Sequence, residues 1–521
     1  MKVKKALISV FDKTGLEDFV KGLAKLNIEI LSTGGTSKMI RSFGVSVTDV
    51  SSYTGFQEML DGRVKTLNPK IHAGILADRD NKDHMNNLKN NEIFPIDMVV
   101  VNLYPFEYVI SRKNVNMDLA IENIDIGGPT MMRSAAKNFK SVAVLSDPLQ
   151  YEMVLQELQK NNCKIKDKTL KNLAVKAFER TSQYDSYIAE YFTETKKDAN
   201  KHDFPNYLNV KMQKISQLRY GENPHQRAAL YQEIPLIKGI NVANLEKFQG
   251  KELSFNNISD LMSAISIVKD FTKPSVAIIK HNNPCAVASS KTLVQAYLDA
   301  LDCDRMSAFG GIIGCNSTVD KNLAKVILDQ GGFVECIIAP EYTKTALKEF
   351  TIKKNLRIVK IPDVIKNKNI EKEFKKIPGG ALIQDQDNKK LYKKDFKVVT
   401  KTKPLEKFFE YFIFGCKVVR HVKSNAIILI DKTKTVGIGA GQMSRVDAVM
   451  IAINKAKEKA KGSILISDAF FPKPDSIDEA YKAGISTIVQ PGGSIKDKDV
   501  IERCNKYNIS MVFTGIRHFK H

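Results

Sequence analysis

A lysine and a histidine stand side by side where an apolar run ends, near the middle of the chain. Residues 276–279 are apolar, which predicts a buried strand, and Lys280 and His281 follow directly. Open α/β sheets bind ligands beyond the carboxyl ends of their strands, so this pair can offer an electrophile beside a base. Asn283 and Pro284 predict a turn into a helix, with Asn283 as N-cap and Pro284 at the first helical position.

Two loops near the N-terminus predict a phosphate site. Residues 32–36, Ser-Thr-Gly-Gly-Thr, follow an apolar strand and open a helix. Glycines let the backbone approach an anion, and a helix N-terminus supplies N–H donors and partial positive charge. Residues 12–15, Asp-Lys-Thr-Gly, follow the preceding strand, so the two loops can share one rim. For either loop alone, a plain strand-to-helix turn is the alternative.

Basic, aromatic and acidic residues occur in short motifs of the same region. Arg63 and Lys65 lie on one face if their segment is extended, and Tyr104 follows a predicted strand. Asp125 opens another Gly-Gly turn, and Lys137 lies in the helix after it. Each alone can be a surface or capping residue. Gathered around a phosphate site, they can perform general acid–base chemistry on a small ribotide.

Two motifs of the second half allow binding hypotheses. Residues 219–226 combine arginine, tyrosine and histidine around a turn, with an ordinary surface turn as the alternative. Residues 437–441 read Gly-x-Gly-x-Gly, which is the wrong spacing for a dinucleotide site. We interpret this loop as a close backbone approach, with Ser444 and Arg445 as an anion clamp.

Pro284 and Cys285 raise the alternative of a zinc hydrolase. Zinc deaminases carry Pro-Cys-x-x-Cys with an upstream His-x-Glu. Position 288 is alanine here, and the chain contains no His-x-Glu. We therefore predict no catalytic metal.

Length and composition bound the remaining classes. A chain of 521 residues predicts two or three domains, and 43% hydrophobic with 26% charged residues is typical of a soluble globular protein. The net charge of +22 allows a nucleic-acid-binding alternative, but the lysines are dispersed and no binding motif accompanies them. The seven cysteines lack Cys-x-x-Cys spacing, and there is neither a spanning apolar stretch nor a signal peptide. We expect a cytoplasmic protein that binds neither nucleic acid nor membrane.

Short apolar strands alternate with helical patterns over the first ~195 residues. This alternation predicts a parallel sheet with helices on both faces, and the polar segment 196–209 predicts a linker. The predicted strands are 6–10, 28–31, 98–102 and 141–145, and the predicted helices are 15–26, 36–43, 128–138 and 169–195.

The second half contains a weak internal repeat. The apolar segments at 277–281, 311–314 and 335–340 have counterparts at 426–430, 463–467 and 486–491. Two related α/β subdomains would explain this repeat. The charged stretch 343–404 is predicted to be a surface excursion between them.

Taken together, these motifs resemble the bifunctional purine-biosynthesis family that joins inosine-monophosphate (IMP) cyclohydrolase to aminoimidazole-carboxamide-ribotide transformylase. The resemblance covers essentially the whole length. Its motifs are, in order, SVFDKTG at 9–15, GRVKTL at 62–67, NLYPF at 102–106, DIGG at 125–128, RYGENPHQ at 219–226, KHNNPC at 280–285, SAFGG at 307–311, GIGAGQ at 437–442 and SDAFFP at 467–472.

The resemblance implies an α/β fold with two domains. Residues 1–197 would form the cyclohydrolase as a methylglyoxal-synthase-like parallel-sheet domain. Residues 198–521 would form the transformylase from two cytidine-deaminase-like α/β subdomains. It also implies 10-formyltetrahydrofolate as co-substrate, a ribotide substrate, and a homodimer with shared transformylase sites.

For the transformylase, the resemblance implies that His281 takes a proton from the 5-amino group. Lys280 would stabilise the formyl oxyanion or assist the leaving folate nitrogen, and Asn425 would hold the histidine or the carboxamide. Glu335 stands where an aspartate is expected. The implied ribotide contacts are Arg219, Tyr220, Gly310, Glu335, Ser444, Arg445, Phe470, Asp475 and Arg517.

For the cyclohydrolase, the resemblance implies Lys137 as the proton-transfer residue, assisted by Lys65, Tyr104 and Asp125. Both reacting groups belong to one molecule, so positioning supplies much of the acceleration. The residues implied to hold the ribotide are Lys13, Thr33, Gly34, Gly35, Thr36, Arg63, Thr66, Asn102 and Gly127.

One geometric question concerns the adjacent pair Lys280 and His281. Successive side chains of a regular strand point to opposite faces of the sheet. Both can serve one substrate only if the backbone turns between them. Arg517 raises a second expectation, that the C-terminal end is folded into a site rather than frayed.

Overall fold

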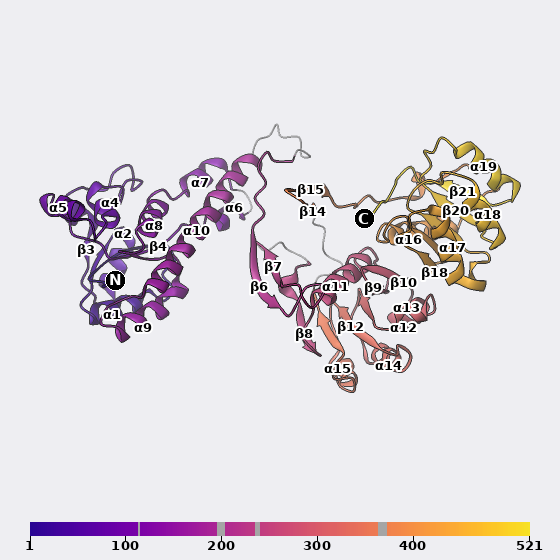
Figure 1. Ribbon diagram of the computed structural model, residues 1–521, viewed down its shortest axis with the longest axis horizontal. Coiled ribbons are helices and arrows are strands. Elements are labelled where there is room, and N and C mark those ends of the chain that lie inside the picture. The colour runs from indigo at the N-terminus through magenta and orange to yellow at the C-terminus, as the bar shows by residue number, and fades with distance from the viewer. Residues whose placement is uncertain (113–114, 195–203, 235–239, 363–371) are drawn as a thin grey trace. The chain divides into compact units, whose positions relative to one another are not determined.

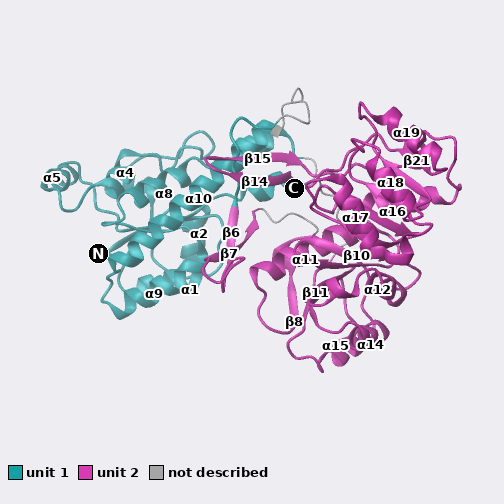
Figure 2. Cartoon of the chain, turned by 45° about the vertical axis from the view of Figure 1, so that its right-hand side comes forward, with its two compact units in different colours: residues 1–211 teal, residues 212–521 magenta. Residues whose placement is uncertain are grey.

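The computed structural model describes residues 1–112, 115–194, 204–234, 240–362 and 372–521 (Figure 1). The chain forms two compact units, Met1–Lys211 and Met212–His521 (Figure 2). The predicted domain boundary at 197/198 and the first part of the predicted linker lie outside the described residues. Within the described ranges, no helix has both the length and the apolar character needed to cross a membrane.

The first unit is built on a five-stranded parallel sheet of order β3-β2-β1-β4-β5, which confirms the predicted sheet. Four of its strands coincide with the predicted apolar runs because these are buried in the core, whereas the short β3 is polar and was not predicted. The strands are β1 (Lys5–Val10), β2 (Glu29–Ser32), β3 (Thr48–Asp49), β4 (Met98–Asn102) and β5 (Ala143–Leu145).

The helices of this unit also follow the predicted pattern. The chain moves from β1 to β2 on one side of the sheet and from β4 to β5 on the other. Because crossovers between parallel strands are right-handed, the connecting helices are expected on opposite faces. The helices are α1 (Leu16–Lys25), α2 (Gly34–Ser42), α3 (Val50–Thr54), α4 (Pro69–Leu76), α5 (Lys82–Asn90), α6 (Phe106–Ile110), α7 (Met117–Glu122), α8 (Gly127–Lys137), α9 (Tyr151–Lys160) and α10 (Asp167–Glu194).

The second unit is built on a twelve-stranded mixed sheet. Its strand order is β16-β21-β20-β19-β17-β18-β10-β9-β11-β12-β13-β8. The central strands are β9 (Ser275–Lys280), β10 (Asn283–Ser289), β17 (Ile427–Asp431) and β18 (Lys434–Gly439), and the outer strands are β8 (Glu246–Gln249), β11 (Gly311–Cys315), β12 (Val334–Ala339), β13 (Arg357–Lys360), β16 (Lys397–Val398), β19 (Ile464–Ser467), β20 (Thr487–Gln490) and β21 (Ser510–Phe513).

Ten strands of this sheet form two copies of one repeat, which confirms the internal repeat of the sequence, and β8 and β16 lie at its two edges. Each copy runs helix, hairpin, helix, strand, helix, strand, helix, strand, and each has the strand order 2-1-3-4-5. The helices of the first copy are α11 (Phe255–Val268), α12 (Leu293–Leu301), α14 (Lys321–Gln330) and α15 (Lys344–Phe350), with the short α13 (Arg305–Ala308) after α12. Those of the second copy are α16 (Phe408–Val419), α17 (Arg445–Ala456), α18 (Asp475–Lys482) and α19 (Asp497–Lys506).

Two predictions for this unit are wrong. The stretch 343–404 is not wholly an excursion, because α15 and β13 at its beginning complete the first repeat, with Ile358 and Val359 fully buried. Asn283 and Pro284 do not start a helix. They begin β10, which returns antiparallel along β9, with Asn283 opposite Lys280.

Two hairpins of this unit form separate two-stranded sheets. One contains β6 (Met212–Leu218) and β7 (Ala228–Glu233), and the other contains β14 (Lys372–Ile377) and β15 (Gly380–Asp385). Neither hairpin pairs with the twelve-stranded sheet, so neither belongs to the core of a repeat.

Candidate functional site

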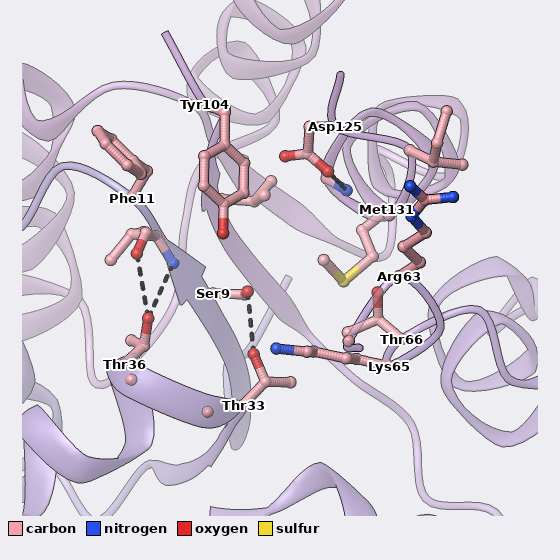
Figure 3. Close-up of a pocket in the computed structure, with 18 of the residues that line it drawn as sticks. Ser9, Phe11, Thr33, Thr36, Arg63, Lys65, Thr66, Tyr104, Asp125 and Met131 are labelled. Carbon is pink, nitrogen blue, oxygen red and sulfur yellow. Dashed lines mark hydrogen bonds between the residues drawn. The ribbon is translucent and has the colours of Figure 1, made fainter. Parts of the chain in front are cut away.

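The first unit has a pocket of about 580 Å³ where β1, β2 and β4 end (Figure 3). Parallel strands bring their carboxyl ends to one edge of the sheet, so loops that are far apart in the sequence meet there. The lining includes Lys65, Tyr104 and Asp125 and every predicted ribotide contact of this unit, namely Lys13, Thr33, Gly34, Gly35, Thr36, Arg63, Thr66, Asn102 and Gly127.

The N-terminus of α2 forms one wall of this pocket. Thr33 is its N-cap in extended conformation, and Gly34 has φ +44°. A Cβ on Gly35 would meet nothing within 4 Å, so its backbone is open to an anion. The ammonium of Lys65 lies 3.6 Å from the position of a Cβ on Gly34, which brings a cation to the same wall. This arrangement suits a phosphate group.

Asn102 and Lys13 shape the loop after β1. The Asn102 Oδ1 accepts the backbone amides of Phe11 and Asp12 at 2.6 and 2.8 Å. The Lys13 ammonium donates to Thr36 Oγ1 at 2.9 Å, and burial lowers the pKa of this lysine. Both polar ends of Asn102 bond to this loop, since its Nδ2 donates to Asp12 O, so its side chain positions the loop.

Asp125 folds back over the start of α8. Its Oδ1 accepts the Gly128 amide at 2.8 Å, and a Cβ on Gly128 would lie only 2.3 Å from Oδ2, so a larger residue here would displace the Asp125 carboxylate. Burial raises the pKa of Asp125, although the amides of Gly128 and Tyr104 oppose the shift. A carboxyl group that keeps its proton to higher pH is suited to proton transfer.

An aromatic pair lies at the pocket and includes a residue that the sequence analysis missed. The rings of Phe11 and Tyr104 are 5.0 Å apart, and both side chains are about half exposed. Figure 3 shows the Tyr104 hydroxyl pointing into the pocket. Phe11 follows β1 directly, so its position at a strand end was the available signal.

Lys137 is not among the residues that line this pocket. It is the last residue of α8, whose first residues form the pocket wall, and its side chain is exposed. A direct proton transfer by Lys137 therefore has less structural support than one by Asp125.

In the second unit, the pair Lys280-His281 lies at the tip of the β9–β10 hairpin. His281 and Asn282 form the turn, with φ +53° and +60°, which is the pattern of a type I′ turn. The backbone thus leaves the strand directly after Lys280, so the alternation of side chains no longer applies. The Lys280 ammonium donates to the carbonyl of Phe309, next to Gly310.

Asn425 lies beside this hairpin, in the loop between α16 and β17 of the second repeat. The amide of Lys423 donates to Asn283 Oδ1 at 3.1 Å, which ties the two loops together. The Asn425 Oδ1 accepts from Arg445 at 2.8 Å, and its Nδ2 donates to the carbonyl of Gln442 at 2.9 Å. Asn425 is therefore held in one orientation.

Ser444 and Arg445, predicted to form an anion clamp, both make bonds within the protein. Ser444 caps α17 by accepting the Asp447 amide. Arg445 is buried and pairs with Asp468, which is fully buried and also accepts from the Ser424 hydroxyl. The guanidinium is thus engaged inside the protein, where it orients Asn425.

The C-terminal segment packs against the same loop, which confirms that this end is not frayed. Ser424 and Lys520 exchange two hydrogen bonds, and the His518 amide donates to Asp468 O at 2.9 Å. Arg517 is exposed within this segment, 4.5 Å from the ring of Phe519.

The other predicted ribotide contacts of this unit lie on separate elements. Arg219 and Tyr220 follow β6, in a loop whose Glu222 carbonyl accepts from Asn256 of α11. Glu335 of β12 is paired with Arg357 at 2.6 Å. Phe470 is partly exposed after β19, and Asp475 is the first residue of α18.

Cys285, the residue that suggested a zinc deaminase, is buried in β10. Burial raises its pKa to about 11, so the thiol is neutral at ordinary pH. Within the described parts of the chain, no group of three or more His, Cys, Asp or Glu side chains is placed to hold a metal ion.

Comparison with known proteins agrees with this arrangement. The family model of the MGS-like domain matches residues 15–130, and that of the AICARFT/IMPCHase bienzyme matches residues 135–455. The chain is 48% identical to the bifunctional purine biosynthesis protein PurH of Acetivibrio thermocellus, over 100% of both chains. It is 49% identical to PurH of Caldicellulosiruptor bescii and 48% identical to PurH of Bacillus cereus, over 99% of this chain and 100% of each relative. The chain therefore belongs to the AICARFT/IMPCHase bienzyme family.

Proposed function

We propose that the two activities of this bienzyme family are divided between the two units. The second unit transfers a formyl group from 10-formyltetrahydrofolate to the 5-amino group of aminoimidazole-carboxamide ribotide. The first unit then closes the formylated ribotide to inosine monophosphate with loss of water. The observation that supports this division best is the pocket of the first unit, which collects all the predicted cyclohydrolase residues except Lys137.

In the first unit, the phosphate of the ribotide would bind at the N-terminus of α2, beside Lys65. The carboxamide nitrogen attacks the formyl carbon, and the formyl oxygen takes up the electron pair of its double bond. The carboxamide nitrogen and the formylated 5-amino nitrogen each lose one proton, the oxygen leaves as water, and a double bond forms between the former formyl carbon and the 5-amino nitrogen. Asp125, which keeps its proton to higher pH than an ordinary carboxyl, can protonate the leaving oxygen, and Lys65 can stabilise its negative charge.

In the second unit, the 5-amino nitrogen attacks the formyl carbon of the folate. His281 accepts the proton that this nitrogen loses, and Lys280 stabilises the oxyanion. The carbon–N10 bond then breaks, and N10 leaves with a proton. Asn425, held by Arg445 and by the backbone of residues 442 and 443, can hold the carboxamide of the ribotide.

Separate variants of the two units test this division. We expect His281→Ala to abolish formyl transfer while cyclisation of supplied formyl-ribotide continues, and Asp125→Asn to have the opposite effect. Product formation from each substrate can be followed by ultraviolet absorbance. If either variant removed both activities while the protein stayed folded, the division would be wrong.

A Lys137→Ala variant tests the proton-transfer role that the family resemblance implies. Its exposed position at the end of α8 leads us to expect a smaller loss of cyclisation than in Asp125→Asn. An equal or larger loss would restore Lys137 as the principal proton carrier.

We also propose a homodimer in the cytoplasm. Phe309 and Phe333 are 59% and 50% exposed beside Gly310, an apolar surface next to the formyl-transfer residues that a second copy of the chain can cover. Sedimentation velocity would give the oligomeric state, and a monomer at micromolar concentration would contradict this part of the proposal.

A further inference from the structure

The turn that carries His281 has an unusual backbone. His281 and Asn282 both have positive φ, where type I′ turns favour asparagine followed by glycine. A residue other than glycine in this region costs about 1–2 kcal/mol, and such residues gather at functional sites. The surrounding structure must therefore hold this turn in place.

Asp260, in the middle of α11, bonds to the backbone of the turn. Its Oδ1 accepts the Asn282 amide at 2.6 Å, and its carboxylate also accepts from the backbone of His281. A carboxylate that accepts neighbouring amides forms charge-assisted hydrogen bonds, which are stronger than neutral ones. Both turn residues are thereby fixed through their backbone, and the His281 side chain stays exposed.

The side chain of Asn282 reinforces this attachment. It lies between Ser259 and Ser263 of α11, within 2.8 and 3.0 Å of their hydroxyls. Ser259, Asp260 and Ser263 share one face of the helix, because residues three and four apart lie above one another. Three residues on one face of α11 therefore bond to the turn.

The second repeat shows that the fold itself does not need this attachment. Its hairpin closes through Lys432 and Thr433, of which Lys432 has φ +55° and Thr433 is not left-handed. Thr433 bonds to Ser289 of β10 through its carbonyl and its hydroxyl. Counting back from the paired strands, the position equivalent to Asp260 in α16 is Tyr411.

We propose that Asp260 is a positioning residue for formyl transfer, which acts by holding the turn His281-Asn282 in its left-handed conformation. It thereby directs His281 and Lys280 to one substrate. This inference rests on the proposed function, in which His281 accepts the proton of the 5-amino group. Asp260 contacts the backbone of the turn and does not itself touch the reacting atoms.

The first test replaces the acceptor. We expect Asp260→Ala to lower kcat for formyl transfer about 10–100-fold with little change in KM for the ribotide, because a misplaced base slows the chemical step more than binding. Asp260→Asn keeps one acceptor oxygen and should recover part of the loss. Asp431→Ala, at the equivalent hairpin of the second repeat, is the matched control and should leave kcat unchanged. Cyclisation in the same preparations reports the integrity of the first unit.

The second test separates positioning from direct chemistry. Glycine adopts positive φ without strain, but Asn282→Gly also removes the bonds to Ser259 and Ser263, so this variant is measured alone as well. Asp260→Ala should then lower kcat by a smaller factor in the Asn282→Gly background than in the unsubstituted protein. If Asp260→Ala lowers kcat by the same factor in both backgrounds, or if it keeps full kcat, the inference is overturned. If Asp260→Ala does not fold, the same comparison is made with Asp260→Asn.

A His281→Ala variant distinguishes failure of this inference from failure of the proposed function. If His281→Ala still transfers formyl groups, the proposed function falls. If it is inactive while both Asp260 variants remain fully active, only the positioning role falls.

Discussion

The two repeats of the second unit share one skeleton but differ at their hairpin tips. Both hairpins close with a two-residue turn, and both returning strands carry a register shift at the same place, between Pro284 and Ala286 in the first and between Thr435 and Gly437 in the second. Lys280 of the first tip corresponds to Asp431 of the second. The same fold therefore carries a lysine and a histidine at one tip and Asp431 with Lys432 at the other, so the chemistry belongs to the turn and not to the fold.

The junction between the repeats is close to two-fold symmetric. The central strands β10 and β18 run antiparallel, with Ala288 opposite Lys434. Asp270 and His421 occupy equivalent positions after α11 and α16, and they meet at 2.8 Å. Arg420 also pairs with Asp270. A contact between equivalent residues marks the axis, and here the two repeats have diverged into a complementary acid and base.

The largest expected effect is the difference between equivalent substitutions at the two hairpin tips. We expect His281→Ala to lower kcat/KM for formyl transfer by about 10²–10⁴-fold, because it removes a general base. Lys432→Ala, at the equivalent position of the second repeat, should change it less than about twofold, since its side chain lies at the opposite tip. Steady-state assays of both variants make the comparison. A similar loss in both would show that the second tip also contributes to catalysis.

The second expected effect concerns the axis between the repeats. Asp270→Ala should lower the free energy of unfolding by about 3–5 kcal/mol, because it leaves the buried Arg420 guanidinium without its partner. Urea denaturation measures the loss in free energy of unfolding, and hydrogen exchange in α11 and α16 shows whether the loss is local to these helices. Lys496→Ala, which breaks an exposed ion pair with Asp499, is the control and should cost at most about 1 kcal/mol. Equal costs would mean that the axis pair is no more than a surface contact.

The third expected effect concerns the packing of a helix on a strand. At this contact, the larger residue lies on the helix in the first repeat and on the strand in the second. In the first repeat, Ala264 of α11 faces Gly314 of β11, and in the second, Gly415 of α16 faces Ile466 of β19. A Cβ on Gly415 would lie 1.9 Å from Cδ1 of Ile466. Gly415→Ala should therefore cost about 1–3 kcal/mol of stability.

A double-mutant cycle tests whether this clash is the cause. Ile466→Val removes the colliding Cδ1 and alone should cost about 0.5–1.5 kcal/mol. The double variant should be more stable than the sum of the two changes by about 0.5–3 kcal/mol. Additive costs would place the strain elsewhere than in this pair.

Sequence patterns sufficed for elements whose signal is local. The strands of the first unit coincide with apolar runs such as 98–102, since a buried parallel strand needs apolar residues on both faces. The first-unit pocket was largely predictable for the same reason, because its residues follow strand ends. Phe11 was missed although it occupies such a position.

The features that were mispredicted or missed depend on partners far along the chain. Asn283 and Pro284 are suited to a helix start and to a strand, and only pairing with β9 decides between them. The sequence gives no local sign of the buried ion pair between Arg445 and Asp468, because the two residues are 23 positions apart. Asp260 gives no local signal, because its partners lie in the turn after the next strand.

The smallest expected effect concerns the pH dependence of the axis pair. Burial opposes the charge of Asp270, but the hydrogen bond from His421 and the Arg420 guanidinium outweigh it and hold the pKa of Asp270 below its ordinary 3.8. Burial lowers the pKa of His421 below 6.5 despite Asp270. Both groups therefore bind protons more readily in the unfolded chain, so stability is complete above about pH 6.5 and falls as His421 and then Asp270 are protonated.

Replacement of the histidine isolates its share of this pH dependence. His421→Gln removes one titrating group, so the free energy of unfolding should change less between about pH 7.5 and pH 5 than in the unsubstituted protein. His225→Gln, at an exposed position of the same unit, should leave the slope unchanged. If His421→Gln leaves the pH dependence of the free energy of unfolding unchanged, His421 is not buried in neutral form. The two repeats would then meet through an ion pair between a charged His421 and Asp270.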